Sequence, residues 1–435
     1  MIETVQKLIA RNAEQLLTPD EIERFEKPVE VHEYYNRVLG ATAVRVVHRM
    51  GDDGSGGGFK ILEVPAGMSH SEMLAANRRD AEALATLMTL KSGIISTSNF
   101  PEGIGEDFGG AKAVMYVPAG TLASREGLNA ILTDYVLTQA GKDALGVGID
   151  RHAPDMNTGE QDMDHMAKVL AELTQDPESI AAFSGKSLEK GGLDGREIAT
   201  AQGLVYTLAN HLETLGRDPR QTTAVVQGSG NVGYHFARLV QQQLGVKIIG
   251  MSDKDTAVVG DAQNPLRIDE TIRFANRGII GWDEESHASL SHPDDLLEVD
   301  ADVFVFAAAP DAVTREKDNV HRLRAPIVLM GANNPMDLDA IDWARENGKS
   351  LVPDVLGNAG GFVASNMEYN QNRTGKKWSQ AMVLTALKAC MDGAYVRVLK
   401  EAGGNPNNLV DAAYRVGIKT QYAKDKTGLY TPQSA

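Results

Sequence analysis

The glycine-rich hexapeptide GSGNVG at residues 228–233 constrains the fold of this chain more than any other part of its sequence. It directly follows the β-branched run TTAVVQ and directly precedes a segment in which Val232, Phe236 and Val240 recur at helical spacing. Glycines between a strand and a helix permit a tight turn and a close approach of the backbone to a pyrophosphate, whose charge the helix N-terminus favours. The sequence therefore predicts a dinucleotide-binding turn; the alternative is a glycine turn that only packs the helix on the strand.

Short apolar runs alternate with helical patterns around and beyond this hexapeptide. A helix is predicted over residues 231–245, where Gly245 provides a helix stop. Strand-helix-strand units build a parallel sheet with right-handed crossovers and helices on both faces, and ligands bind at the carboxyl ends of its strands. The predicted fold class is therefore α/β, with a Rossmann-type doubly wound parallel sheet whose strands lie at 222–226, 246–253, 301–308, 326–333 and 350–356.

Asp253 lies twenty residues beyond Gly233, at the end of the predicted second strand. A carboxylate at that place can accept hydrogen bonds from the adenine ribose hydroxyls, which favours NAD. Lys254 beside it could instead meet the 2′-phosphate of NADP, so NADP stays possible. The simpler interpretation of Asp253 is an ordinary turn residue.

The first half of the chain predicts a second α/β unit. Strands are predicted at 38–50, 59–67 and 111–120, and helices at 69–91 and 124–141. Thr158 and Gln161 form a capping-box pattern, which predicts that a helix begins there and that a loop precedes it. The glycine-rich stretch 184–195 indicates a domain boundary. The predicted divisions are an N-terminal α/β domain at 1–195, a dinucleotide-binding domain at 196–365, hinge helices at 366–404, and C-terminal helices at about 405–435 that pack back onto the first domain.

Composition narrows the function classes. A chain of 435 residues exceeds the size of one hydrophobic core, so two domains are expected. The formal net charge of -16 disfavours nucleic acid and anionic membranes as partners. The single cysteine, Cys390, excludes an internal disulfide, fits a reducing compartment and is best interpreted as a buried thiol. We find no secretory signal pattern and no membrane-length apolar run, so a cytoplasmic location is predicted.

Six ordered motifs together resemble one enzyme family. They are GGAK (109–112), APDMNT (153–158), GREIATAQG (195–203), QGSGNVG (227–233), GANNP (331–335) and VPDVLGNAGG (352–361). In these segments the chain resembles the glutamate, leucine, phenylalanine and valine dehydrogenases, from about Val44 to Tyr430. REIATAQG and the late segment DAAYRVGIKTQYA resemble the glutamate dehydrogenases more than the other branches.

The resemblance implies reversible oxidative deamination of an L-amino acid to a 2-oxo acid and ammonia, with hydride transfer to NAD or NADP. Lys112 matches the family's catalytic lysine, and a lysine in a closed cleft can activate the water that attacks the imine carbon. Asp155 matches the catalytic aspartate, which moves protons to and from the amino nitrogen. Without the resemblance, Lys112 would be read as a surface lysine at a strand edge and Asp155 as a loop residue that stabilises the next helix.

The predicted substrate contacts divide between glutamate and an apolar amino acid. Lys91 is the candidate for the α-carboxylate, although a twelve-residue stretch at 96–107 suggests an insertion between it and Lys112. Gly57 and Gly58 match the family's glycine pair, but Gly56 stands where glutamate-specific members carry a lysine. A desolvated side-chain carboxylate needs a cationic partner. Ser365 matches a serine that glutamate-specific members use, and Lys60, Arg151 and His152 are the candidate replacements for the missing lysine.

The remaining expectations concern the cofactor, assembly and alternatives. The resemblance implies a homo-oligomer, specifically a hexamer, whose first domain binds substrate and forms the assembly contacts. No metal site is predicted, because His152, Asp155, Asp162 and His165 match no familiar ligand spacing. A catalytically silent dinucleotide-binding protein and a hydroxy-acid dehydrogenase stay open as alternatives. The predicted cofactor-binding residues are Thr200, Gly228, Gly230, Asn231, Val232, Gly233, Asp253, Ala332, Asn333 and Asn358.

Overall fold

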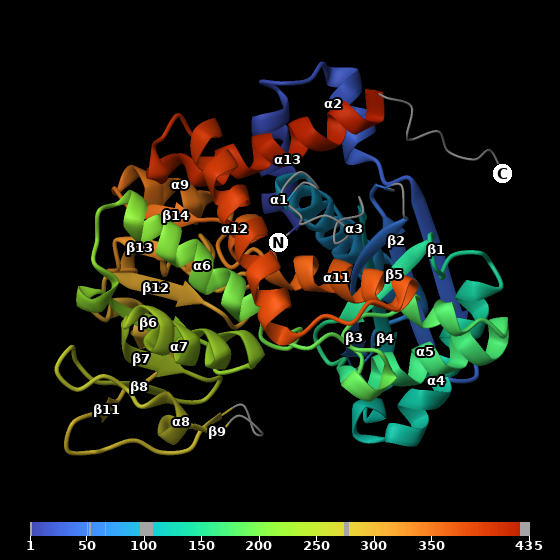
Figure 1. The fold of residues 1–435 in the computed structure, drawn as a ribbon, viewed down its shortest axis with the longest axis horizontal. Coiled ribbons are helices and arrows are strands. Elements are labelled where there is room, and N and C mark those ends of the chain that lie inside the picture. The colour runs from blue at the N-terminus through green and yellow to red at the C-terminus, as the bar shows by residue number, and fades with distance from the viewer. Residues whose placement is uncertain are drawn as a thin grey trace.

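The computed structural model describes residues 2–49, 51, 54–65, 67–95, 108–273 and 278–426. Two sheets, each with helices packed on it, form the two sides of the molecule, with the first sheet at the right of Figure 1 and the second at the left. Among the described residues, none of the helices has the length and apolar character needed to span a membrane. The predicted insertion at 96–107 lies outside the described residues.

The first sheet has the strand order β1-β2-β4-β3-β5. β3 is parallel to both β4 and β5, so these three strands end at one edge of the sheet. The strands predicted at 38–50, 59–67 and 111–120 are confirmed, although the second begins earlier than predicted and includes the glycines at 56–58. The bounds are β1 (Glu30–Asn36), β2 (Ala41–Val47), β3 (Ser55–Glu63), β4 (Gly109–Val117) and β5 (Asp150–Pro154).

Helices cover both faces of the first sheet. On one face α3 (His70–Ile95) packs Ala81 and Ala85 against Val44, Val46 and Val114 of the sheet. On the other face, α4 (Arg125–Ala140) and α5 (Glu160–Thr174) share a core with the sheet. The helices predicted at 69–91 and 124–141 are confirmed.

The helix predicted from the capping-box pattern is confirmed, but its N-cap is one residue later than Thr158. α5 begins at Glu160, and Gly159 is its N-cap, with the backbone N–H of Gly159 donating to Asp162 Oδ2 at 2.8 Å. The Thr158 hydroxyl instead donates to the Phe59 carbonyl at 2.8 Å, which ties it to β3. The residues before Thr158 are also not all loop, because 150–154 form β5. The ionisable side chains in DRHAP hide this strand, since Asp150 and His152 face each other and Arg45 inside the protein rather than water.

The second sheet has the strand order β11-β8-β7-β6-β12-β13-β14. The five strands from β7 to β14 in that order are parallel, and the antiparallel β8 and β11 complete one edge. The chain runs outward from β6 in both directions, so the order reverses between β6 and β12 and creates a switch point. The bounds are β6 (Thr223–Gln227), β7 (Lys247–Ser252), β8 (Ala257–Val259), β11 (Ala288–Ser289), β12 (Val303–Phe306), β13 (Ile327–Met330) and β14 (Ser350–Val352).

The predicted doubly wound parallel sheet is therefore confirmed, although the strands predicted at 301–308, 326–333 and 350–356 are shorter than predicted. The strand predicted at 350–356 ends at Val352, because Pro353 lacks a backbone N–H for the ladder and leads into a short helix. Gly245 caps the predicted helix with a φ of 73°. The other elements here are α6 (Ala199–Thr214), α7 (Asn231–Leu244), α8 (Ile268–Thr271), β9 (Ile272–Arg273), β10 (Gly278–Ile279), α9 (Leu338–Glu346) and α10 (Asp354–Gly357).

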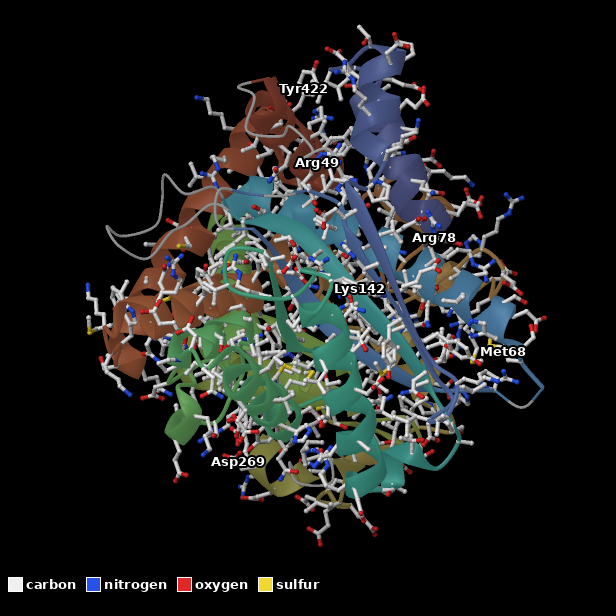
Figure 2. The ribbon with its side chains drawn as sticks, turned by 90° about the vertical axis from the view of Figure 1, so that its right-hand side faces the viewer. Arg49, Met68, Arg78, Lys142, Asp269 and Tyr422 are labelled. Carbon is white, nitrogen blue, oxygen red and sulfur yellow. The ribbon has the colours of Figure 1, made fainter. Side chains whose placement is uncertain are left out.

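The last three helices connect the two sides of the molecule. They are α11 (Gly360–Thr374), α12 (Gln380–Glu401) and α13 (Leu409–Lys426), and they pack near α1 (Ile2–Ala13) and α2 (Pro19–Glu26). α13 approaches α3 so closely that a Cβ on Gly93 would lie 2.6 Å from the Gly417 carbonyl oxygen. Figure 2 shows Tyr422 near the N-terminal helices, where its hydroxyl donates to Glu21 of α2. Residues 427–435 lie outside the described residues.

Candidate active site

A large cleft lies between the two sheets. Its volume is about 1110 Å³, and residues from β3, α3, α6, α7 and α11 line it. Its open end faces the carboxyl ends of β6 and β12, at the switch point of the parallel sheet. The predicted residues that line this cleft are Gly57, Gly58, Lys91, Asp155, Thr200, Gly230, Asn231, Val232, Ala332, Asn333, Asn358 and Ser365.

Lys112 and Asp155 form an ion pair at the wall of the cleft. Lys112 lies on β4 with its side chain 1% exposed, and its Nζ donates to Asp155 Oδ2. Burial acts to raise the pKa of Asp155, but the neighbouring Lys112 ammonium outweighs it and holds that pKa below its usual value. A Cβ on Gly58 would lie 2.5 Å from Asp155 Oδ2 and 2.6 Å from Lys112 Nζ. Gly58 therefore leaves the space in which the pair forms.

The loop after β5 fixes the Asp155 carboxylate. The backbone N–H of Asp155 donates to Thr158 Oγ1 at 2.7 Å, and that of Met156 donates to Asp155 Oδ1 at 2.6 Å. Asn157 adopts a φ of 60°, in the left-handed region that asparagine tolerates, and its side chain donates to the Ile61 carbonyl at 2.9 Å. The motif APDMNT is therefore a compact turn pinned to β3.

Lys91 lies near the C-terminal end of α3 and reaches across the cleft. Its Nζ donates to Asn333 Oδ1 at 2.8 Å, and Asn358 Nδ2 donates to the same oxygen at 2.9 Å. Burial lowers the pKa of Lys91 to about 8, and the Asp354 carboxylate opposes that shift. The candidate substrate lysine and two candidate cofactor residues are thus joined, although they come from opposite sides of the cleft.

Asp354 is a buried carboxylate that the sequence patterns did not single out. It accepts hydrogen bonds from the backbone N–H of Asn334 at 2.8 Å and of Val355 at 2.8 Å. Burial raises its pKa, and the Lys91 charge acts against that shift. Asp354 belongs to the motif VPDVLGNAGG. Its cationic neighbour Lys91 lies on α3 and comes close only when the chain folds, so the sequence alone does not indicate this pair.

The hexapeptide GSGNVG forms the predicted turn between β6 and α7. Gly228 has a φ of 103°, and a Cβ on Gly233 would lie 1.9 Å from the Gly228 carbonyl oxygen, so both positions require glycine. Gly230 is the N-cap of α7, and no atom would lie within 4 Å of a Cβ added to it. Asn231 Nδ2 donates to the Glu197 carbonyl at 2.9 Å.

Asp253 is not among the residues that line the cleft. Its Oδ1 accepts the backbone N–H groups of Asp255 and Thr256, and its Oδ2 accepts that of Ile279 at 2.9 Å. The carboxylate therefore organises the turn after β7, which was the simpler of the two interpretations. Lys254 is exposed and lies 3.2 Å from the Asp255 carboxylate.

Arg196 lines the cleft but was not a predicted site residue, although it lies within the motif GREIATAQG. Its Nε donates to Ser365 Oγ at 3.2 Å, and Ser365 in turn donates to the Gly361 carbonyl at 2.9 Å. Burial lowers the pKa of Arg196, and the Glu368 charge opposes the shift. In the sequence, only its position just before the helix of GREIATAQG could have pointed to Arg196, because its partner Ser365 lies on α11.

The other candidates lie away from the reacting centre or have partners on this chain. His152 bonds Tyr135 at 2.9 Å and lies 3.3 Å from Asp150 inside the first sheet, so it is not a cleft cation. Asp162 pairs with Arg125, and His165 bonds Thr133. Within the described ranges, no three His, Cys, Asp or Glu side chains gather as metal ligands would. Cys390 is buried, as predicted, and burial raises the pKa of its thiol to about 12.

Comparison with known families gives two matches that cover most of the chain. Residues 191–428 match the family described as glutamate/leucine/phenylalanine/valine dehydrogenase. Residues 28–172 match the Glu/Leu/Phe/Val dehydrogenase dimerisation domain.

Individual relatives and solved structures agree with these matches. The chain is 32% identical to the catabolic NAD-specific glutamate dehydrogenase of Bacillus subtilis, over 79% of this chain and 76% of that protein. It is 30% identical to a glutamate dehydrogenase of Thermotoga maritima, over 96% and 93%. The hetero-hexameric glutamate dehydrogenase of Thermus thermophilus, in a leucine-bound form, has the same fold, with a TM-score of 0.83, 22% identity, and coverage of 99% of this chain and 97% of that one.

Proposed function

The chain belongs to the glutamate, leucine, phenylalanine and valine dehydrogenase family, and we propose that it deaminates L-glutamate reversibly to 2-oxoglutarate and ammonia. It is an NAD(P)-dependent amino-acid dehydrogenase. The observation that carries the proposal is the Lys112–Asp155 pair. Asp155 lines the same cleft as Lys91 and the GSGNVG turn, and Lys112, which is not itself a lining residue, bonds its carboxylate. Gly56 favours a second candidate, an apolar amino acid, because it removes a cation from β3.

The GSGNVG turn fits a dinucleotide. The open space before Gly230 and the N-terminus of α7 would hold the pyrophosphate, while Thr200, Asn231, Val232, Ala332, Asn333 and Asn358 line the adjoining cleft. When bound, the nicotinamide accepts the hydride from the substrate α-carbon. We propose NAD as the preferred form, because Asp253 would repel a 2′-phosphate near the end of β7. NADP remains compatible, since relatives of both specificities match the chain.

Three side chains of this chain divide the work on the amino acid. Lys91 would pair with the α-carboxylate, because a buried ammonium is a suitable partner for it. Asp155, ionised beside Lys112, would take a proton from the α-ammonium before the hydride leaves, and would return protons to the departing nitrogen. Lys112, after its ammonium has released a proton to solvent, would accept a proton from the water that adds to the imine carbon. Asp155, carrying the proton taken from the α-ammonium, would protonate the amino nitrogen so that ammonia leaves, and would then take the hydroxyl proton as the carbonyl forms.

The organisation of the molecule supports further proposals. We propose that residues 1–195 bind substrate and form assembly contacts, that 196–365 bind the dinucleotide, that 366–404 act as hinge helices, and that about 405–435 return to the first domain. The two sides would close over the substrate and exclude water. We further propose a homo-hexamer in the cytoplasm, which the family's dimerisation domain and the buried Cys390 support.

Initial rates of nicotinamide reduction against a panel of L-amino acids test the function. We expect the highest kcat/KM with glutamate, and a higher kcat/KM with NAD than with NADP. The reverse reaction should require ammonia, because the 2-oxo acid can be reduced only after it has formed an imine. Preference for an apolar amino acid would contradict the glutamate assignment. Dinucleotide binding without turnover would indicate the silent alternative, and reduction without ammonia would indicate a hydroxy-acid dehydrogenase.

Lys91 predicts a pH dependence of substrate binding. Its pKa of about 8 means that it is cationic below pH 8 and loses its charge as the pH rises through that value. The KM for the amino acid should therefore rise above a pH of about 8, so that kcat/KM falls with that midpoint. Lys91→Arg should remove this alkaline limb, because arginine keeps its charge. A KM that stays flat across this range, or an unchanged limb in Lys91→Arg, would remove Lys91 from the α-carboxylate site.

A further inference from the structure

The bare position at Gly56 lies directly beside Arg151. β3 and β5 are parallel neighbours, and Gly56 and Arg151 are partners in their register. A Cβ added at Gly56 would lie 3.7 Å from Arg151 Cβ and 3.8 Å from Arg151 Nε. Register partners on adjacent strands project on the same side of the sheet. The Arg151 side chain therefore runs over the surface that a side chain at position 56 would otherwise cover.

The guanidinium of Arg151 is held at the cleft wall by two aromatic rings. Its Cζ lies 3.9 Å from the centroid of the Tyr369 ring and also contacts Phe108. Arg151 is 7% exposed and lines the cleft. A guanidinium packed on aromatic faces keeps its N–H groups in its own plane, where they can bind a carboxylate in a bidentate manner.

Tyr369 places this guanidinium close to Ser365. The two residues are four apart on α11, so they share one face of the helix. Ser365 Oγ already accepts a hydrogen bond from Arg196 Nε at 3.2 Å. Two arginines from different elements thus approach the same turn of α11 from the cleft.

Two other cations that line the cleft, Lys60 and Lys186, form ion pairs with carboxylates of this chain. Lys60 Nζ lies 3.4 Å from Asp80 Oδ2. Lys186 Nζ lies 2.8 Å from Glu368 Oε1, in a pair with no exposed surface. A substrate anion would have to compete with those carboxylates.

We propose that Arg151 replaces the lysine missing at Gly56 and, with Arg196 and Ser365, binds a second carboxylate on the substrate side chain. The amino acid that this chain oxidises is then a dicarboxylic one. The cation of this part of the cleft would then come from β5 rather than from β3, and the Arg151 side chain lies within contact distance of the place where a side chain at position 56 would begin. This inference rests on the proposed amino-acid dehydrogenase function.

The first test measures specificity in Arg151→Met, which keeps the aliphatic length and removes the charge. We expect kcat/KM for glutamate to fall about 100-fold, mainly through KM, because a buried carboxylate loses its partner. The rate with L-norvaline, which has an uncharged side chain, should be retained or rise. Arg217→Met is the matched control, because Arg217 pairs with Asp302 and is not among the cleft residues. A glutamate kcat/KM within about threefold of the unmodified protein would overturn the proposal.

The second test replaces the cation at position 151 by a lysine at position 56. Gly56 has no left-handed backbone conformation, and the nearest contacts of an added Cβ are all with Arg151. The double variant Gly56→Lys/Arg151→Val should therefore fit, and we expect it to recover glutamate kcat/KM to within about tenfold of the unmodified protein. A double variant as poor with glutamate as Arg151→Met would contradict the exchange of roles.

A third test needs no variant. In the unmodified protein, glutarate should compete with the amino acid at about 100-fold lower concentration than pentanoate, which lacks the second carboxylate. Equal inhibition by the two acids would overturn the proposal even if Arg151→Met failed to fold. Turnover of apolar amino acids without glutamate would overturn this inference alone. Turnover of no amino acid would overturn the proposed function, and the inference with it.

Discussion

Replacing Lys112 by alanine should lower kcat by about 10⁴-fold, while dinucleotide affinity should stay within about threefold of the unmodified protein. The side chain is 1% exposed and its Nζ contacts Asp155, which lines the cleft, so the loss of Lys112 acts on the reacting centre through this contact. Lys112 is not among the lining residues, whereas Gly230, Asn231 and Val232 of the dinucleotide turn are. Stopped-flow or steady-state rates with glutamate, together with fluorescence titration of the dinucleotide, measure the two quantities separately.

Folding of Lys112→Ala should survive the loss of the ion pair. Asp155 has a side chain that is 29% exposed, so water can solvate the carboxylate that loses its partner. Lys142→Ala is the matched control, because Lys142 is exposed, bonds the Glu33 carbonyl and is not among the residues that line the cleft. A Lys112→Ala protein with near-normal turnover would remove Lys112 from the catalytic assignment.

The parallel sheet and its glycine turn could be predicted because their signals are local. Each of the five parallel strands of the second sheet contains a short buried apolar run, and the turn needs Gly228 and Gly233 for reasons that act within a few residues. The first sheet was harder, because β5 carries Asp150, Arg151 and His152 in only five residues. A strand whose polar side chains are buried has the sequence pattern of a loop, because the partners of those side chains, such as Arg45, lie on other strands.

The candidate site was predicted residue by residue through the family resemblance, but its contacts were not. Lys91 and Asn333 stand 242 residues apart, and Arg196 and Ser365 stand 169 apart. No periodicity or spacing joins such pairs, because the sheets and α11 create the contact. The missing lysine at Gly56 was visible in the sequence, and Arg151 was one of three candidate replacements. The register of β3 and β5 then places Arg151, and neither of the other two candidates, directly beside Gly56.

Glu368→Gln should destabilise the protein by about 3 kcal/mol, the largest effect on stability that we expect from a single conservative substitution. Glu368 and Lys186 are fully buried, and Lys186 Nζ lies 2.8 Å from Glu368 Oε1. An amide keeps the size of the side chain and can still accept the backbone N–H of Gly185, which now donates at 2.7 Å. What it removes is the negative charge, so the Lys186 ammonium is left uncompensated in the interior. Thermal unfolding at fixed protein concentration should show a midpoint lower by about 5 to 10 °C.

The double variant Lys186→Met/Glu368→Gln separates the charge from the packing. If the cost in Glu368→Gln is an unpaired buried ammonium, removing that ammonium as well should restore part of the stability. Glu401→Gln is the matched control, because Glu401 pairs with Arg415 and Lys419 at the surface, where an ion pair contributes about 1 kcal/mol or less. Equal midpoints for Glu368→Gln and Glu401→Gln would contradict the assignment. The Lys186–Glu368 pair links the segment around Lys186 to α11, the helix that also carries Ser365. Loss of this pair should therefore also loosen the part of the cleft wall that would contact the substrate side chain.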